Sequence, residues 1–144
     1  MYFSISLRDG VVYLPTMGKM DKGFYRGIEP VAVVPAINSD ALRTALLDTI
    51  ARGNPVVPML KRREWPPPIV LKYAGVKGWS AFERGMMLWG IEERGGVWQI
   101  IGKRKKTDGA MVDDPDRIIA FPTGASVEDV VDRMVAILQQ TVRK

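Results

Sequence analysis

The chain has 144 residues and a formal net charge of +5, and it contains neither cysteine nor histidine. This length is enough to bury a hydrophobic core without disulfides or metal, and we expect one globular domain over residues 1–144. Without cysteine and histidine there is no disulfide framework, no thiolate nucleophile, no Ser-His-Asp triad and no zinc or non-haem iron site built on those ligands. We therefore predict a non-enzymatic protein with no cofactor and no metal.

The sequence carries no pattern typical of export or membrane insertion. Residues 1–6 lack the basic region and the long apolar region of a secretory signal. No stretch reaches the ~18 consecutive apolar residues that a transmembrane helix requires. We expect a cytoplasmic protein without a membrane partner.

The N-terminal segment is typical of a β-hairpin. Apolar and polar side chains alternate over residues 2–8, which is the period of a half-buried strand. Asp9-Gly10 suits a two-residue type I′ turn, because this turn needs positive φ at both central positions. Residues 11–14 form the return strand, and the register that this turn imposes places Leu7 opposite Val12.

The next segment predicts extended chain, a helix and a loop. Residues 24–28 and 31–34 are predicted as two short extended segments that Pro30 separates. Asn38 or Ser39 is suited to cap a helix over about 39–52, which ends where Gly53 and Pro55 follow. The inner face of this helix is predicted to consist of Leu42, Ala45, Leu46 and Ile50. Five prolines in residues 54–68 predict an extended loop with some polyproline character.

The second half of the chain predicts more strands and a final helix. Residues 69–74 are predicted as a strand, residues 75–78 as a turn, and residues 80–84 as one helical turn. Residues 89–94 and 97–101, joined by Gly95-Gly96, predict a second hairpin in which Ile91 faces Ile100 and Glu93 faces Trp98. Another strand is expected at 118–121.

The last element has the clearest pattern. The residues from Ser126 to Asp129 form a capping-box signature at the start of a helix over about 126–142. One face of this helix is apolar and is predicted to carry Val127, Val130, Val131, Met134, Leu138 and Val142.

Strands come in runs in this sequence and do not alternate with helices. This order favours an α+β fold with a mainly antiparallel sheet built from hairpins. We expect the two helices, about 39–52 and 126–142, to pack on one face of that sheet.

Two short motifs resemble functional loops but lack part of the pattern. Gly75–Gly78 has the Gly-x-x-Gly spacing of the nucleic-acid-binding loop of KH domains, which joins two helices. Because a strand is predicted just before it, we interpret this segment as a plain turn. Gly78–Phe82 lacks the final glycine of a nucleophile elbow, and there is no histidine to act as a base. We interpret Ser80 as a helix N-cap that forms a capping box with Glu83.

Three carboxylates gather at Asp113, Asp114 and Asp116. Such groups can bind a hard cation, but the twelve-residue calcium-loop pattern is missing. Because Asp-Pro pairs commonly start turns, we predict that these residues form a solvated turn.

Positive charge and tryptophan are concentrated in residues 61–106. This region has eleven Lys or Arg against four Asp or Glu, a net of +7, whereas the rest of the chain has a net of −2. It also contains all four tryptophans: Trp65, Trp79, Trp89 and Trp98. Some of these rings are expected to fill the core, and the pattern leaves open which of them lie at the surface.

Basic and aromatic residues together favour a binding role. Our leading hypothesis is a non-enzymatic protein-interaction module, of which a bacterial inhibitor or toxin-neutralising immunity protein is one example. The predicted interface consists of Arg62, Arg63, Trp65, Trp79, Lys103, Arg104, Lys105 and Lys106. The alternative is an RNA- or DNA-binding domain that uses the same region 61–106. A carboxylate-dependent enzyme is the third and weakest interpretation.

Overall fold

Two β-hairpins form the centre of the fold. In the computed structural model, which describes residues 1–143, the first hairpin consists of β1 (Tyr2–Arg8) and β2 (Val11–Lys19). Asp9 and Gly10 have φ of 52° and 75°, as a type I′ turn requires, and Leu7 pairs with Val12. The second hairpin consists of β4 (Met87–Arg94) and β5 (Val97–Lys105), where Ile91 pairs with Ile100 and Glu93 with Trp98. Both predicted hairpins and their registers are confirmed.

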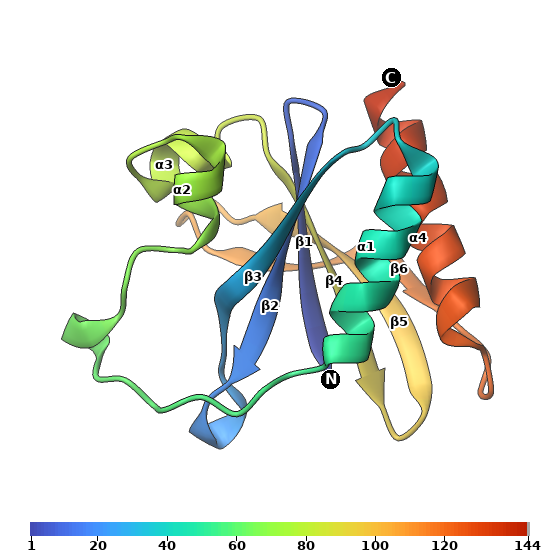
Figure 1. Cartoon of the computed structure of the whole chain (residues 1–144), viewed down its shortest axis with the longest axis horizontal. Helices are drawn as coiled ribbons and strands as arrows, with labels where there is room; N and C mark the ends of the chain where they lie inside the picture. Colours follow the sequence, from blue (N-terminus) through green and yellow to red (C-terminus); the bar gives the residue numbers. More distant parts are fainter. Residues whose placement is uncertain (144) are drawn as a thin grey trace.

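A single antiparallel sheet joins these hairpins to two outer strands. Strand β1 pairs with β4, β3 (Tyr25–Pro35) pairs with β2, and β6 (Met111–Ala120) pairs with β5. The six strands therefore lie in the order β3-β2-β1-β4-β5-β6. Figure 1 shows that α1 (Ser39–Arg52) and α4 (Val127–Val142) lie side by side against one face of this sheet. The predicted α+β class is confirmed, with both helices close to their predicted bounds.

Side-chain caps begin both long helices. The Asn38 carboxamide accepts a hydrogen bond from the Ala41 amide at 3.1 Å. At the start of α4 the Ser126 hydroxyl accepts from the Asp129 amide at 3.1 Å, and the Asp129 carboxylate accepts from the Ser126 amide at 3.3 Å. Each cap pairs amides that have no partner inside the helix, which explains why local sequence predicts these boundaries well.

The main core lies between the sheet and the two long helices. Trp89 and Trp98 are 3% and 6% exposed and belong to this core, so two of the four tryptophans of the chain have a structural role. The principal buried side chains are Phe3, Ile5, Leu7, Val12, Leu14, Leu42, Leu46, Ile50, Ile91, Ile100, Val130, Val131, Met134 and Leu138.

A smaller apolar cluster lies on the opposite face of the sheet. It contains Tyr13 of β2, Val70 and Leu71 of the short helix α2 (Val70–Ala74), and Phe82 of the short helix α3 (Trp79–Glu83). Figure 1 shows α2 and α3 packed together at one end of the sheet, away from α1 and α4. The region between residues 54 and 86 therefore forms a separate layer.

Residues 69–74 are not the predicted strand. They form α2, whose first turn is closed by a hydrogen bond from the Leu71 amide to the Pro68 carbonyl at 3.1 Å. A short apolar run has no clear period, so a buried helical turn cannot be distinguished from a strand by pattern alone. The helix is selected here because it packs Val70 and Leu71 against Tyr13 and Phe82.

Pro30 does not divide β3 into two segments. The ladder passes from the Thr16–Ile28 pair to the Pro15–Val31 pair, so an irregularity in register leaves residues 29 and 30 outside it. The Thr16 hydroxyl donates to the Pro30 carbonyl at 2.8 Å. A proline without an amide hydrogen is tolerated here because β3 is an edge strand and the bulge needs no donor from it.

The predicted turn at Asp113, Asp114 and Asp116 is also wrong, because these residues belong to edge strand β6. Asp113 pairs with Lys103 of β5, with 2.5 Å between the ammonium nitrogen and the carboxylate oxygen. Because the ion pair neutralises its charge, a carboxylate is tolerated in this strand, although the local composition predicts a turn. Charges and a proline along an exposed edge also discourage pairing with other chains.

The inward face of α4 provides a test of the fold. Val131→Asp and Leu138→Asp are each expected to lower the free energy of unfolding by more than about 3 kcal/mol, because each places an unpaired charge in the core. Ala136→Asp adds the same charge at an exposed position of the same helix and is expected to change it by less than about 1 kcal/mol. Denaturant unfolding measures all three, and near-wild-type midpoints for both core variants would contradict this packing.

Candidate protein-binding surface

The proline-rich segment 54–68 is attached to the sheet at both ends. At its start, the Lys19 amide donates to the Pro55 carbonyl at 2.8 Å and the Val57 amide donates to the Lys19 carbonyl at 3.0 Å. At its end, Ile69 lies against Gly27 of β3, where an added Cβ would be 3.0 Å from the Ile69 Cγ2 atom. Gly27 therefore permits this close approach. Between the two attachments the segment runs away from the sheet (Figure 1).

Trp65 lies in this segment and is held in one orientation. Its indole nitrogen donates to the Leu60 carbonyl at 3.0 Å, and the residue is 45% exposed. Arg62 and Arg63 precede it in a single 3-10 turn, Arg62–Glu64, and both are exposed. An exposed aromatic ring fixed by its own hydrogen bond and flanked by guanidinium groups is a typical anchor of a protein interface.

Two adjoining pockets lie between this segment and the sheet. The first, of about 190 Å³, is lined by Tyr25 and Arg26 of β3, by Trp65 and by the three prolines that follow it. The second, of about 140 Å³, is lined mainly by apolar atoms of β1, β2, β4, Ile69 and Trp79. Gly27 and Pro68 line both pockets, so the two lie next to each other, and we refer to this pair of pockets as the groove.

Trp79 forms the far wall of this groove and links α3 to the sheet. Its ring lies 5.4 Å from that of Phe82, and its indole nitrogen donates to the Glu83 carboxylate at 2.7 Å. Glu83 also pairs with Lys105 of β5 at 2.5 Å. Hydrogen bonds from the Lys105 ammonium and the Trp79 indole hold the pKa of the Glu83 carboxyl below its usual value. The predicted capping box of Ser80 and Glu83 is wrong, because Gly78 occupies the N-cap position.

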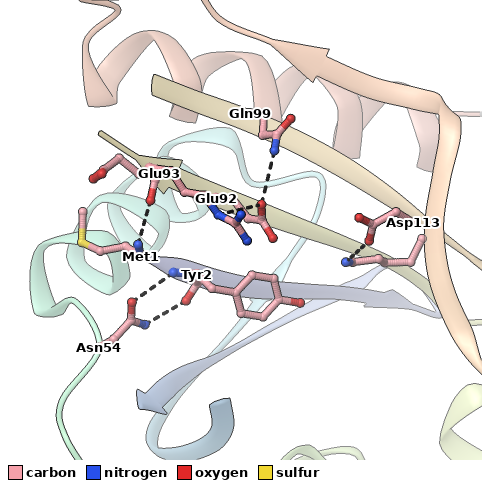
Figure 2. Close-up of polar contacts among 9 residues, drawn as sticks. Met1, Tyr2, Asn54, Glu92, Glu93, Gln99 and Asp113 are labelled. Atoms are coloured by element: carbon pink, nitrogen blue, oxygen red, sulfur yellow. Dashed lines mark hydrogen bonds and ion pairs between the residues drawn. The ribbon is translucent and has the colours of Figure 1, made fainter. Parts of the chain in front are cut away.

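Lys103 is part of the sheet and is not a free surface charge. Its side chain is only 14% exposed, it pairs with Asp113, and its ammonium lies 5.7 Å from the centre of the Tyr2 ring. Figure 2 shows this end of the sheet, with Tyr2 held by two hydrogen bonds to Asn54. Burial raises the pKa of the Tyr2 hydroxyl, so the ring is neutral beside Lys103.

The predicted interface residues therefore do not form one continuous patch. Trp65 and Trp79 border the same groove, with Arg62 and Arg63 just before Trp65. Lys103, Arg104 and Lys105 belong to β5, and the alternation of a strand sends Arg104 to the face opposite its two neighbours. Lys106 follows the strand and lies 3.9 Å from Asp108.

Sequence reasoning missed the contribution of β3 to this site. Tyr25, Arg26 and Gly27 line the groove although they precede Trp65 and the three prolines after it by about forty residues. No local pattern marks them, since they meet the prolines only through the pairing of β3 with β2.

Gly75–Gly78 joins two helices, contrary to our expectation. The preceding segment is α2 and the following one is α3, so the reason given for excluding a KH-like loop was wrong. Both helices have only five residues and pack on the small cluster around Phe82. Gly75 has φ of 69° and ends α2 in a left-handed conformation, which accounts for a glycine at that position.

Two larger hollows lie beside the long helices. One, of about 490 Å³, is bordered by β6 and α4, and its Arg117 stacks 5.2 Å from the Trp89 ring and donates to the Lys103 carbonyl. The other, of about 500 Å³, lies between β3 and α1, and its Arg52 donates to the Thr16 hydroxyl at 3.1 Å. The guanidinium group of each hollow is thus already engaged.

Neither a metal centre nor a membrane span is found in the described part of the chain. Within residues 1–143 no three Asp, Glu, His or Cys side chains are grouped closely enough to hold a metal ion. No helix among these residues has both the length and the apolar character needed to cross a bilayer.

Solved structures of other proteins share this fold. No protein-family model matches the chain, and no curated protein matches it in sequence. A protein of unknown function from Neisseria meningitidis superimposes with a TM-score of 0.66 and 12% identity, over 97% of this chain and 93% of that one. A chain of the CdiA-CT/CdiI toxin and immunity complex from Yersinia pseudotuberculosis superimposes with a TM-score of 0.60 and 12% identity, over 97% and 95%. The shared architecture thus extends over nearly the whole of each chain.

The Glu83 carboxylate allows a pH test of how the groove wall is held. Because its pKa is lowered in the folded state, it stabilises the fold above its unfolded value of about 4.5, and this contribution is lost as the pH falls through the lower folded pKa. Glu83→Gln is expected to be less stable than wild type at pH 7, with a difference that shrinks below about pH 4.5.

Unfolding curves at pH 7 and pH 3.5 provide the measurement. In a chain that already carries Lys105→Gln, the main ion-pair partner of Glu83 is absent. Glu83→Gln should therefore lower the free energy of unfolding by less in that chain than in wild type. An equal loss of stability at both pH values would show that the carboxylate charge is not what holds α3.

Proposed function

We propose that this chain is a non-enzymatic, immunity-type protein that binds and neutralises a toxin. The observation that carries the proposal is the match along almost the full length of a chain from a toxin and immunity complex. The chemistry of the sequence favours the immunity role over the toxin role, because histidine and cysteine, the usual nucleophiles and bases, are absent.

The proposed toxin-binding surface is the groove between the proline-rich segment and the sheet, together with its basic border. Trp65 and Trp79 provide apolar surface inside the groove. Arg62, Arg63 and Lys106 provide exposed positive charge near or beyond the two ends of the groove. Lys105 extends the surface along β5 and Lys103 supports it from within the sheet, whereas Arg104 lies on the opposite face of the strand and outside this surface. Aromatic and arginine side chains in a partly enclosed site are the residues that usually dominate protein–protein binding energy.

Capture of the partner and a growth assay test this function. The purified chain is immobilised, source lysate is passed over it with and without nuclease treatment, and captured proteins are identified by mass spectrometry. We expect a protein whose capture is unaffected by nuclease. Expression of that protein in a bacterial host should arrest growth, and co-expression of this chain should restore it. Loss of capture after nuclease treatment, or a partner that leaves growth unaffected, would contradict the proposal.

Substitutions then separate aromatic anchoring from phosphate binding. Trp65→Ala is expected to weaken the complex with the captured protein by at least about tenfold, because it removes a central apolar contact. The double variant Arg104→Gln/Lys106→Gln should weaken it less and act mainly on the association rate, as is typical of charges at the rim of an interface or outside it. Lys103 and Lys105 are left unchanged because their ion pairs hold the sheet and α3.

Affinities are measured at 50 and 200 mM salt. A nucleic-acid complex with six to ten phosphate contacts would weaken by roughly 10³–10⁵ over this range. For the complex of this chain with its captured protein, we expect a much smaller change in affinity between the two salt concentrations. The opposite pattern, with a steep salt dependence and normal binding by Trp65→Ala, would favour the nucleic-acid hypothesis.

A further inference from the structure

We propose that the pocket between the α2–α3 layer and the sheet receives a single phenolic ring, presented by the protein partner as a tyrosine side chain. This is the pocket of about 140 Å³ that Trp79 borders. The hydroxyl of Ser6, on the sheet side of the pocket, recognises the hydroxyl of the phenol. The inference rests on the proposed function, because it names one contact of the partner at the same surface.

The register of the sheet forms the floor of this pocket. Ser4 and Ser6 alternate along β1 with Phe3 and Ile5, which belong to the main core, so the two serines face the opposite layer. Leu88 of β4 is the direct partner of Ser6 in the ladder and lies on the same face. Two serines at adjacent inward positions of one strand leave a hollow that larger side chains would fill.

The walls are apolar, and the volume matches one ring. Ile69, Val70 and Trp79 of the covering layer line the pocket together with Pro15 and Met17 of β2. Its volume of about 140 Å³ is close to the roughly 150 Å³ of an apolar protein cavity that binds benzene. Pockets that hold a whole small-molecule ligand usually begin at about 300 Å³. The size therefore favours a single aromatic side chain carried by a larger partner.

The Ser6 hydroxyl adds a polar requirement to this apolar pocket. Ser6 is 4% exposed, and no hydrogen bond of its hydroxyl is found among residues 1–143. The buried residues Thr16 and Thr49, by contrast, each donate to a backbone carbonyl. A buried hydroxyl without a partner costs free energy until one is supplied. A phenol supplies a group that both donates and accepts, whereas a plain phenyl ring would leave Ser6 unpaired.

The pocket is accessible and its aromatic wall is already ordered. Ile69, Trp79 and Leu88 are only partly buried, so the rim of the pocket is open to an incoming side chain. The Trp79 ring is held by its contact with Phe82 and by its hydrogen bond to Glu83. A fixed wall loses little conformational freedom on binding, and an aromatic wall favours an aromatic occupant.

Two small compounds test the chemistry of the pocket. p-Cresol is the side chain of tyrosine as a free molecule, and toluene is the same molecule without the hydroxyl. Each is titrated into the isotope-labelled full chain and followed by NMR, which gives both affinities. We expect intermolecular nuclear Overhauser effects between the bound p-cresol ring and the methyl groups of Ile69, Val70 and Leu88, which line the pocket.

Ser6→Ala tests the role of the hydroxyl. The ratio of p-cresol affinity to toluene affinity should fall at least about threefold, the size expected for one net hydrogen bond. Ser39→Ala removes a hydroxyl from an exposed position at the start of α1, in the opposite layer, and should leave the ratio unchanged. Thermal unfolding of Ser6→Ala should show an equal or higher midpoint, because the variant removes an unpaired buried hydroxyl. A serine with a structural hydrogen bond would give a lower midpoint.

Competition with the captured protein tests the source of the ring. Saturating p-cresol should weaken the complex of this chain with that protein at least about threefold, and should weaken the complex of Ser6→Ala by a smaller factor. A complex that is unchanged while p-cresol occupies the pocket would overturn the docking of a tyrosine side chain.

No binding of p-cresol, binding without contacts to the three methyl-bearing side chains, or an unchanged affinity ratio in Ser6→Ala would also overturn this inference. These results are separate from the growth assay. A chain that rescues growth but does not bind p-cresol keeps the proposed function and loses the pocket assignment. A chain that binds p-cresol in the pocket but rescues no growth keeps the pocket chemistry and loses the proposed function.

Discussion

Strand β1 pairs with β2 on one side and with β4 on the other, and its pairing with β4 joins two hairpins that are far apart in the chain. Phe3 and Ile91 are direct partners in this ladder, and both side chains are almost completely buried. Because side chains alternate along a strand, this one register directs the apolar sets of both hairpins to the same face. The long helices α1 and α4 then cover that face.

Covering one face with two long helices leaves the other face to shorter elements. The Pro-rich segment, α2 and α3 cross it, and they bury only a small cluster around Tyr13 and Phe82. The groove beside Trp65 and Trp79 lies in this layer, in the region where the chain carries its excess of positive charge.

The tryptophans show how the two faces divide structural and surface roles. Trp89 and Trp98 lie on paired strands and point into the main core, whereas Trp65 and Trp79 lie in the connection between hairpins and border the groove. The lysine run is divided in a similar way. Lys103 and Lys105 neutralise carboxylates of β6 and α3, while Arg104 and Lys106 remain exposed. Residues of one type thus differ in role according to strand alternation and neighbouring charge.

The sequence by itself determined the two hairpins, the caps of the long helices and the α+β class. These features depend on contacts between residues close in the chain, such as the Asp9-Gly10 turn and the Ser126 capping box. Only the tertiary structure decided that residues 69–74 are helical, that Pro30 lies at a bulge within one strand, and that Tyr25 of β3 borders the same pocket as Trp65. Each of these outcomes depends on a partner distant in sequence, whose position is set by the strand order β3-β2-β1-β4-β5-β6, and local patterns carry no information about that order.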